Sequence, residues 1–199
     1  MRIRPDSFGF TLLLSALAAL PPLSIDMGLP ALELIRGALG ASAEQATLTL
    51  SVFLFGFGAA QLLVGPLSDR AGRRPVMLGG LALYALGGIG CALAPSIGLF
   101  LVGRALQGVG AGLVVGACYV AMGALFPNNL WRRVLAAISG VWGIASLLGP
   151  LLGGLFAQHG HWRLLFWMFA GQALHFALGA LKLVPAKTVK TKNTRVPVR

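Results

Sequence analysis

The sequence predicts an all-α integral membrane protein, built as a bundle of six transmembrane helices. Its 199 residues are 57% hydrophobic and only 11% charged, and the mean hydropathy of +0.83 is too high for a soluble domain of this size. Apolar stretches of roughly 20 residues, the length that crosses a bilayer, recur along the chain. Most of the 28 glycines lie inside those stretches, as in membrane helices that pack closely against one another.

The six expected spans follow one another with short connections. The first apolar run follows a basic start, as a signal peptide would, but it continues to residue 29, no small-residue cleavage motif closes it, and five more spans follow. We therefore interpret it as an uncleaved first span. Residues 1–183 form the expected six-span domain, and residues 184–199 are expected to form a basic, disordered tail. The spans are 8–29, 46–67, 75–94, 97–125, 134–157 and 162–183.

The basic residues are distributed unevenly across this topology. Thirteen of the 16 fall on one side, whereas the loops on the other side hold only Arg36 and Arg163. The positive-inside rule then predicts a protein of the inner membrane with both termini in the cytoplasm. Topology thus explains the net charge of +11, and no nucleic-acid partner is expected because the basic tail lacks interleaved aromatic residues. The thirteen are Arg2, Arg4, Arg70, Arg73, Arg74, Arg132, Arg133, Lys182, Lys187, Lys190, Lys192, Arg195 and Arg199.

Ionisable residues inside the spans are few, so each is a candidate for function. Asp26 lies near the outer end of the first span and Arg104 in the outer third of the fourth, within about two helical turns of each other in depth. An ion pair between them would lower the free energy of burying both charges. Alternatively, Asp26 reaches the interface and caps the following turn. Gln107 shares the face of Arg104, and Gln61 lies deep in the second span; each could hydrogen-bond a substrate or another helix.

The sequence GPLSDRAGRR, residues 65–74, is a short charged connection between the second and third spans. Gly65 would allow the second span to lie close to its neighbours, and Gly72 could take the positive φ of a tight reversal. Asp69 is expected to accept hydrogen bonds from backbone N–H groups or from Arg73. The arginines would hold the loop in the cytoplasm; they are Arg70, Arg73 and Arg74.

Small residues recur every four positions in two spans. In the fifth span, Gly149 and Gly153 share a face, and Pro150 removes one helical hydrogen bond between them. That segment either packs closely, bends the helix, or presents a smooth face that can slide. In the fourth span a similar stripe indicates close helix packing; its members are Gly108, Gly112 and Gly116.

Four segments together resemble the major facilitator superfamily, and closely its drug:proton antiporters of the bicyclomycin and chloramphenicol resistance type. The resemblance covers roughly residues 8–183 and implies a proton-linked exporter of small drug-like molecules. The segments are SIDMGLPAL at 24–32, GPLSDRAGRRPVML at 65–78, RALQGVGAG at 104–112, and GPLLGG at 149–154 followed by HWRLLFW at 161–167.

The resemblance implies a role for each matching residue. Asp26 would couple protons or a cationic substrate, Arg104 would take part in proton transfer, and Asp69 would be the gating acid of the cytoplasmic loop. Gly28 stands where the family is expected to have an aromatic residue. The antiporter motif, which would face the other half of the transporter, comprises Gly149, Pro150, Gly153 and Gly154.

The family has twelve spans in two six-span halves, with the substrate cavity between them, so the six spans here correspond to the N-terminal half. Three interpretations stay open: a truncated product, a half that pairs with itself or with a separate second half, and a frameshifted end. Without a partner half, the face of Gly149 and Gly153 would meet lipid and promote formation of a homodimer.

Two functions remain open. The first is efflux by drug:proton antiport; the second is a non-transporting remnant, or a membrane partner of a full-length transporter. An enzyme is not expected, because no nucleophile–base set appears, and neither is a cofactor. His159 and His161 are two metal ligands without a third, so no metal site is expected either. Cys91 and Cys118 are interpreted as small core residues.

Overall fold

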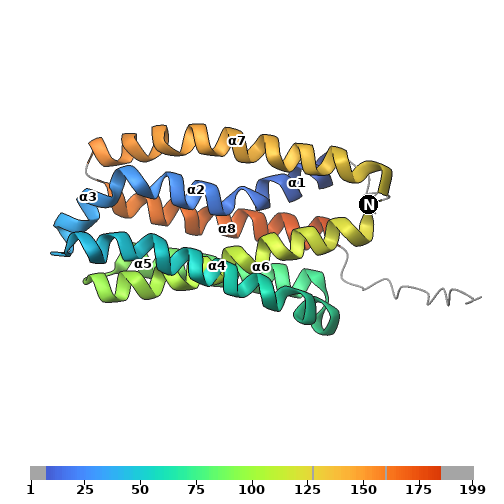
Figure 1. Ribbon diagram of the computed structural model, residues 1–199, viewed down its shortest axis with the longest axis horizontal. Helices are drawn as coiled ribbons and strands as arrows, with labels where there is room; N and C mark the ends of the chain where they lie inside the picture. Colours follow the sequence, from blue (N-terminus) through green and yellow to red (C-terminus); the bar gives the residue numbers. More distant parts are fainter. Residues whose placement is uncertain (1–7, 127, 160, 185–199) are drawn as a thin grey trace, which may run out of the picture.

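The computed structural model is all-helical and describes residues 8–126, 128–159 and 161–184 (Figure 1). Its helices are α1 (Phe8–Ala18), α2 (Leu20–Asp26), α3 (Gly28–Ala38), α4 (Ala43–Ala71), α5 (Arg73–Leu93), α6 (Ile97–Leu125), α7 (Asn128–Gln158) and α8 (Trp162–Leu183).

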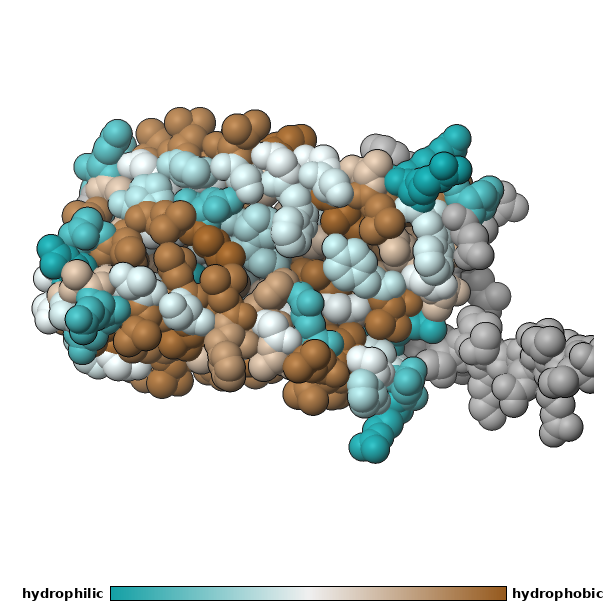
Figure 2. Space-filling view, in the orientation of Figure 1, coloured by the Kyte–Doolittle hydropathy of each residue, from teal (hydrophilic) through white to brown (hydrophobic). Residues whose placement is uncertain are grey.

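Six stretches of the described chain are long and apolar enough to cross a membrane, which confirms the predicted six-span bundle. Helices α6 and α8 have the predicted bounds, whereas α4 and α7 extend beyond the predicted spans at both ends. The face seen in Figure 2 is mostly hydrophobic along the length of the bundle, and hydrophilic residues gather at its two ends. The chain is therefore a multi-pass membrane protein.

The first span differs from the single helix that the sequence predicted. The chain forms α1 and α2 in succession, and after Met27 it continues into α3, where a loop was expected. Pro21 and Pro22 stand in the first turn of α2, where their missing N–H groups are tolerated. Pro30 cannot donate to the carbonyl four residues earlier, that of Asp26, and this is where α2 ends. The prolines thus divide the first span into short segments.

Helix α6 is the centre of one side of the bundle, and it packs along both α4 and α5. Helix α8 packs on the opposite side of α5, and α7 packs on α1, α2 and α3. Figure 1 shows α7 running along one edge of the bundle, with α1 and α2 between it and the remaining helices. The first span is therefore the wall that α7 shares with the rest of the molecule.

The glycine stripe on α6 packs against α4, as predicted. A Cβ atom at Gly108 or Gly112 would overlap the backbone of Phe53 or Phe57, respectively, and one at Gly116 would lie 2.6 Å from Val64 Cγ2. On its other side, α6 approaches α5 through further glycines, including Gly80 and Gly87 of α5 and Gly103 and Gly110 of α6. The three helices are held at backbone contact.

Aromatic rings fill the space between α5, α6 and α8. Phe100 meets Trp162 and Phe166 edge to face, with ring centroids 5.9 and 5.1 Å apart, and Tyr84 meets Phe169 in the same way at 6.3 Å. Cys91 and Cys118 are free and buried in the core, in agreement with the sequence analysis. Val184, placed in the tail by the sequence, is buried at the end of α8; the predicted tail beyond it lies outside the described residues.

Candidate functional site

Arg104 on α6 lies at the centre of a buried polar cluster, and only 3% of its surface is exposed. Its Nη1 donates to the Ser24 hydroxyl of α2 at 2.9 Å and to Gln107 Oε1, one turn along α6, at 3.0 Å. The Phe53 ring of α4 lies with its centroid 4.4 Å from Arg104 Cζ, and Phe166 of α8 lies at 6.0 Å. One guanidinium group thus contacts side chains from four helices.

No carboxylate of the described residues forms an ion pair with this guanidinium. In the part of the chain that the structure describes, the ion pair that forms is the exposed one between Arg36 and Glu33 on α3. Arg104 instead uses neutral acceptors and aromatic faces, which compensate a buried charge only partly. A charge kept in this state inside a membrane bundle favours a functional role over a purely structural one.

Tyr84 and Cys91 extend this cluster, and neither was a candidate in the sequence analysis. Tyr84 is fully buried, and its hydroxyl lies near the Ser24 hydroxyl and the Arg104 guanidinium. Gln107 Nε2 is buried and has no hydrogen-bond partner within the described part of the chain, and Cys91 Sγ lies 4.0 Å from Gln107 Oε1. Of these groups, only Gln107 could be assigned to the cluster from the sequence, because it lies three residues after Arg104 on the same helix face. The cluster therefore holds unused hydrogen-bonding capacity around Arg104.

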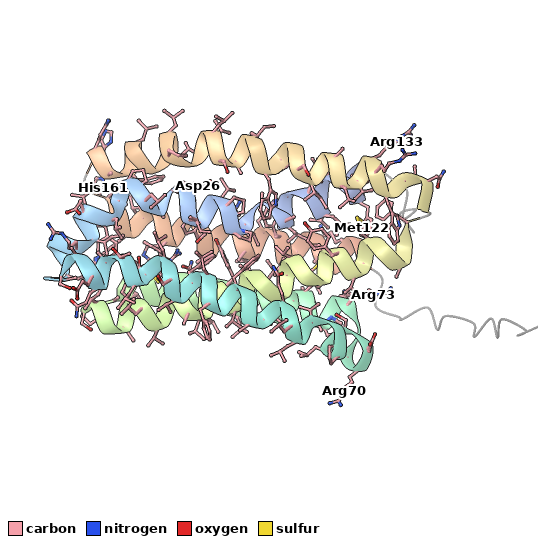
Figure 3. All side chains as sticks on the ribbon, viewed as in Figure 1. Asp26, Arg70, Arg73, Met122, Arg133 and His161 are labelled. Atoms are coloured by element: carbon pink, nitrogen blue, oxygen red, sulfur yellow. The ribbon has the colours of Figure 1, made fainter. Side chains whose placement is uncertain are left out.

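The predicted ion pair between Asp26 and Arg104 is wrong. Asp26 is half-buried, and its Oδ2 is buried without a partner in the part of the chain that is described. Ser24 faces Arg104, and a residue two positions later on a helix is rotated by about 200°, so Asp26 points to the opposite side, toward α7. Figure 3 shows Asp26 nearer to the end of the bundle with His161 than to the end with Arg70 and Arg73.

Gly149 and Gly153 of α7 form the surface against which the Asp26 turn packs. A Cβ atom at Gly149 would lie 2.6 Å from Asp26 Cβ, and one at Gly153 would overlap the backbone of Met27. The expectation that this face meets lipid or a second copy is therefore wrong, because the interrupted first span occupies it. Pro150 is exposed, and Gly154 has no atom near its Cβ position, so these two residues of the motif point away from the seam.

The loop between α4 and α5 is a single residue, Gly72, whose φ of 89° confirms the predicted reversal. Arg74 donates from Nη2 to the Leu181 carbonyl at 2.8 Å, which joins the start of α5 to the last turn of α8. Asp69 is exposed and accepts no hydrogen bond from the described chain, so the expected bond from Arg73 does not form. Gly65 is also exposed, with open space at its Cβ position, contrary to the expected close packing.

Gln61 lies exposed on α4 and takes no part in the Arg104 cluster. A separate hollow of about 200 Å³ lies between α6 and α7, and its lining combines two aromatic residues, an aliphatic residue and a hydroxyl: Tyr119, Trp142, Ile138 and Ser139. The sequence analysis did not identify this hollow. Exposed aromatic residues beside a hydroxyl are suited to contact a small molecule that is mostly apolar.

A six-span bundle that encloses a buried charge has the architecture of one half of a two-halved secondary transporter. Residues 8–197 match the Major Facilitator Superfamily, and the chain belongs to this family.

Relatives and solved structures agree with this assignment. The Multidrug resistance protein MdtL of Escherichia coli O81 (strain ED1a) is 41% identical over 159 residues, which cover 78% of this chain and 40% of that protein. The MdtL protein of Escherichia fergusonii is 40% identical over 191 residues, covering 90% and 48%. The chain spans about half the length of these curated relatives.

The fold resembles half of the xylose transporter XylE from E. coli in its inward open conformation, with a TM-score of 0.73, 17% identity, and 90% of this chain and 48% of that chain covered. The proton:xylose symporter XylE bound to 6-bromo-6-deoxy-D-glucose gives a TM-score of 0.74 at 19% identity, with coverage of 89% and 45%. At this identity the likeness concerns the fold.

Proposed function

We propose that the chain acts in the export of small drug-like molecules in exchange for protons, as the N-terminal half of an antiporter of the bicyclomycin and chloramphenicol resistance type. In this proposal it spans the inner membrane with both termini in the cytoplasm. The family match and the multidrug resistance relatives support the class of substrate. Arg70, Arg73 and Arg133 lie at one end of the bundle, which supports the orientation (Figure 3).

The observation that carries the proposal is the buried carboxylate oxygen of Asp26, which has no hydrogen-bond partner among the residues that the structure describes. A deprotonated carboxylate without a partner is unfavourable inside a membrane bundle, so binding a proton or a cationic substrate would lower its free energy. Arg104 binds Ser24 on the other side of the same segment, so its positive charge forms no ion pair with Asp26. Asp26 therefore has no ion-pair partner among the described residues, as the proposed coupling role requires.

Helix α7 is placed to respond to this exchange. The backbones of Gly149 and Gly153 contact the Asp26–Met27 turn directly, so a change in the hydration or rotamer of Asp26 acts on α7 without an intervening side chain. Pro150 leaves α7 with one missing hydrogen bond at the same level, which lowers the resistance of the helix to bending there. In the proposed cycle, proton binding at Asp26 would shift α7 relative to the first span.

The substrate would contact the α6–α7 hollow at Tyr119, Ser139 and Trp142. Its aromatic walls favour flat apolar molecules, and the hydroxyl groups offer hydrogen bonds. This hollow lies on the same face of α7 as the Asp26 seam, about two turns away, because Trp142 and Gly149 are seven residues apart. One helix would thus connect the substrate contact with the proton site.

The proposal is tested by measuring drug-dependent proton release from proteoliposomes. Asp26→Asn keeps the size of the side chain but cannot bind and release the proton, and we expect it to abolish exchange while the protein still inserts. Glu44→Gln is the matched control, because Glu44 is an exposed acid in the first turn of α4. Normal exchange by Asp26→Asn would remove Asp26 from the mechanism.

A second candidate function is that of a membrane partner which does not transport by itself. Large apolar side chains stand exposed on α4 and α7, among them Phe55, Leu62 and Leu147 at 79%, 82% and 78% of their surfaces, and a second six-span unit could cover them. Co-expression with a separate six-span unit distinguishes the two candidates. Drug-dependent proton exchange by the assembled pair that is lost in Asp26→Asn would support the antiporter half, and assembly without any contribution of Asp26 to exchange would support the non-transporting partner.

A further inference from the structure

A long apolar groove runs between α7 and α8, outside the sites described above. Its outer part has a volume of about 390 Å³ and lies at the α7–α8 turn, where His159 and His161 border it. Its inner part has a volume of about 550 Å³ and reaches Gln172 and His175 of α8. Leu152 lines both parts, so they form one continuous groove.

The groove is formed by two facing stripes at helical spacing. The lining residues recur every three or four positions on both α7 and α8. The floor is the interrupted first span, which contributes Leu23 and Met27. The α7 stripe comprises Leu152, Leu155, Phe156 and His159, and the α8 stripe Leu164, Met168, Gly171, Gln172 and His175.

Helices α7 and α8 do not close over this groove. Helix α7 packs on the first span and α8 mainly on α5, and the two make few contacts with each other, so the stripes stay open to the outside. Leu155 and Leu164, on opposite walls, are exposed over 47% and 50% of their surfaces. Gly171 deepens the groove, because nothing lies within 4 Å of its Cβ position.

The position of the groove in the membrane selects its occupant. Both walls belong to transmembrane spans, so the groove faces lipid rather than water along most of its length. From Trp162 to Gln172 the α8 wall rises about 15 Å, which is half of the roughly 30 Å hydrocarbon thickness of a bilayer. The groove therefore runs from the membrane surface to the bilayer centre, the depth that one acyl chain of one leaflet occupies.

We propose that the α7–α8 groove is a binding site for one acyl chain of an outer-leaflet phospholipid. The chain enters at the level of His159 and His161, where imidazoles can hydrogen-bond the ester or phosphate groups, and ends beside Gly171 and Gln172. This site goes beyond the proposed export function; only the choice of leaflet rests on the orientation proposed there.

Photolabelling tests the proposal. The chain is reconstituted in vesicles of phosphatidylethanolamine and phosphatidylglycerol that contain a trace of phospholipid with a diazirine on its acyl chain. Labelling of the peptides carrying Leu152, Leu155 and Met168 is compared with labelling of Leu174 and Leu178, which are exposed on α8 outside the groove. We expect labelling per exposed side chain to favour the groove residues.

The decisive variant is Gly171→Phe, which fills the groove without displacing backbone. We expect it to lower groove labelling about tenfold relative to the reference peptides, because the ring takes the volume and apolar contacts of the acyl chain. Gly140→Phe is the matched control, since Gly140 is an exposed glycine of α7 with open space at its Cβ position and does not line the groove. Leu152→Trp fills the same groove from α7 if Gly171→Phe fails to insert.

A third variant separates an acyl chain from a polar ligand. Gln172 Oε1 is buried without a partner among the described residues, so a hydrogen-bonding ligand would need Gln172, whereas an acyl chain would not. Gln172→Leu is therefore expected to keep or increase groove labelling. Loss of labelling in Gln172→Leu would overturn the proposal, as would equal labelling of groove and reference peptides, or cross-linking of the groove to a second protein in place of lipid.

Discussion

The α4–α5–α6 block and α7 use glycine in the same spacing but differ in how they are held. In the block, glycines of α6 meet uninterrupted neighbouring helices on two sides, and α6 is enclosed by them. Helix α7 has one glycine seam, at Gly149 and Gly153, and the seam meets the chain where it passes from α2 to α3. Most of the remaining surface of α7 is exposed. Helix α6 is thus held on two sides, whereas α7 is held on one side only.

The two regions therefore differ in the freedom that they give to their charged residue. Arg104, which belongs to the block, has partners on α2, α4, α6 and α8, so its side chain is held from several directions. The α7 seam instead meets Asp26, whose buried oxygen has no partner in the described chain. A charged group with fixed partners resists movement, and one without them allows alternative arrangements. We therefore expect substitutions in the block to reduce stability most, and those in the seam to affect stability less.

The largest effect is expected for Gly108→Ala in the block. The new Cβ would overlap the Phe53 carbonyl, which belongs to the α4 backbone and cannot rotate away, so α4 and α6 must separate. We expect the free energy of unfolding in detergent to fall by about 3 kcal/mol. Circular dichroism during denaturant unfolding provides the measurement.

Gly58→Ala is the control for this change. Gly58 is exposed on α4 with nothing near its Cβ position, so the substitution keeps the packing and raises helix propensity, with an expected gain of about 0.5 kcal/mol. Equal effects of Gly108→Ala and Gly58→Ala would show that backbone contact does not hold the block together.

The sequence predicted the block well, because its signals are local. Span length and hydropathy located the helices, and the four-residue spacing on the fourth span identified the face that packs. The same spacing on the fifth span led to a wrong partner, since spacing shows that a helix approaches closely but not which helix it approaches. The partner depended on the prolines that interrupt the first span, whose consequence is tertiary.

A smaller loss is expected for Gly153→Ala in the seam. Its Cβ would overlap the Met27 backbone, but Met27 lies between α2 and α3, where the chain can shift more easily than inside a long helix. We expect a loss of about 2 kcal/mol in the free energy of unfolding. Gly154→Ala serves as the comparison, because the next residue along α7 has open space at its Cβ position. A Gly153→Ala protein as stable as Gly154→Ala would contradict the seam.

The candidate site was predicted in part. The rarity of charge in the membrane identified Asp26 and Arg104, and helical spacing added Gln107. The sequence could not show that Ser24, and not Asp26, faces Arg104, because approximate depth says nothing about the rotation of a helix about its axis. Tyr84 and Phe53 were missed because single aromatic residues in apolar spans are usual, and their contact with Arg104 depends on how α4, α5 and α6 assemble.

Phe53→Leu tests how far Arg104 depends on its aromatic neighbour. The substitution keeps an apolar side chain but removes the ring whose centroid lies 4.4 Å from the guanidinium carbon, and we expect a loss of about 1 kcal/mol in stability. Phe57→Leu, one turn along α4 and stacked on Phe53, is the control that removes a ring away from Arg104. If the two variants lose the same stability, the ring contributes packing alone and Arg104 does not depend on it.

The smallest effect is expected for Arg74→Gln, at the α4–α5 turn of the block. Arg74 donates to the Leu181 carbonyl in the last turn of α8, where carbonyl groups lack helical partners and a positive charge is favourable. Because this hydrogen bond is exposed, its loss should reduce the free energy of unfolding by only about 0.5 kcal/mol.

The local consequence of Arg74→Gln should be larger, since the end of α8 would lose its connection to α5. Hydrogen exchange of the amides at 180–183 should therefore accelerate in Arg74→Gln and stay unchanged in Arg73→Gln, whose side chain has no such bond in the described chain. Equal exchange in both variants would mean that the packing of α8 on α5, and not Arg74, holds this end of the helix.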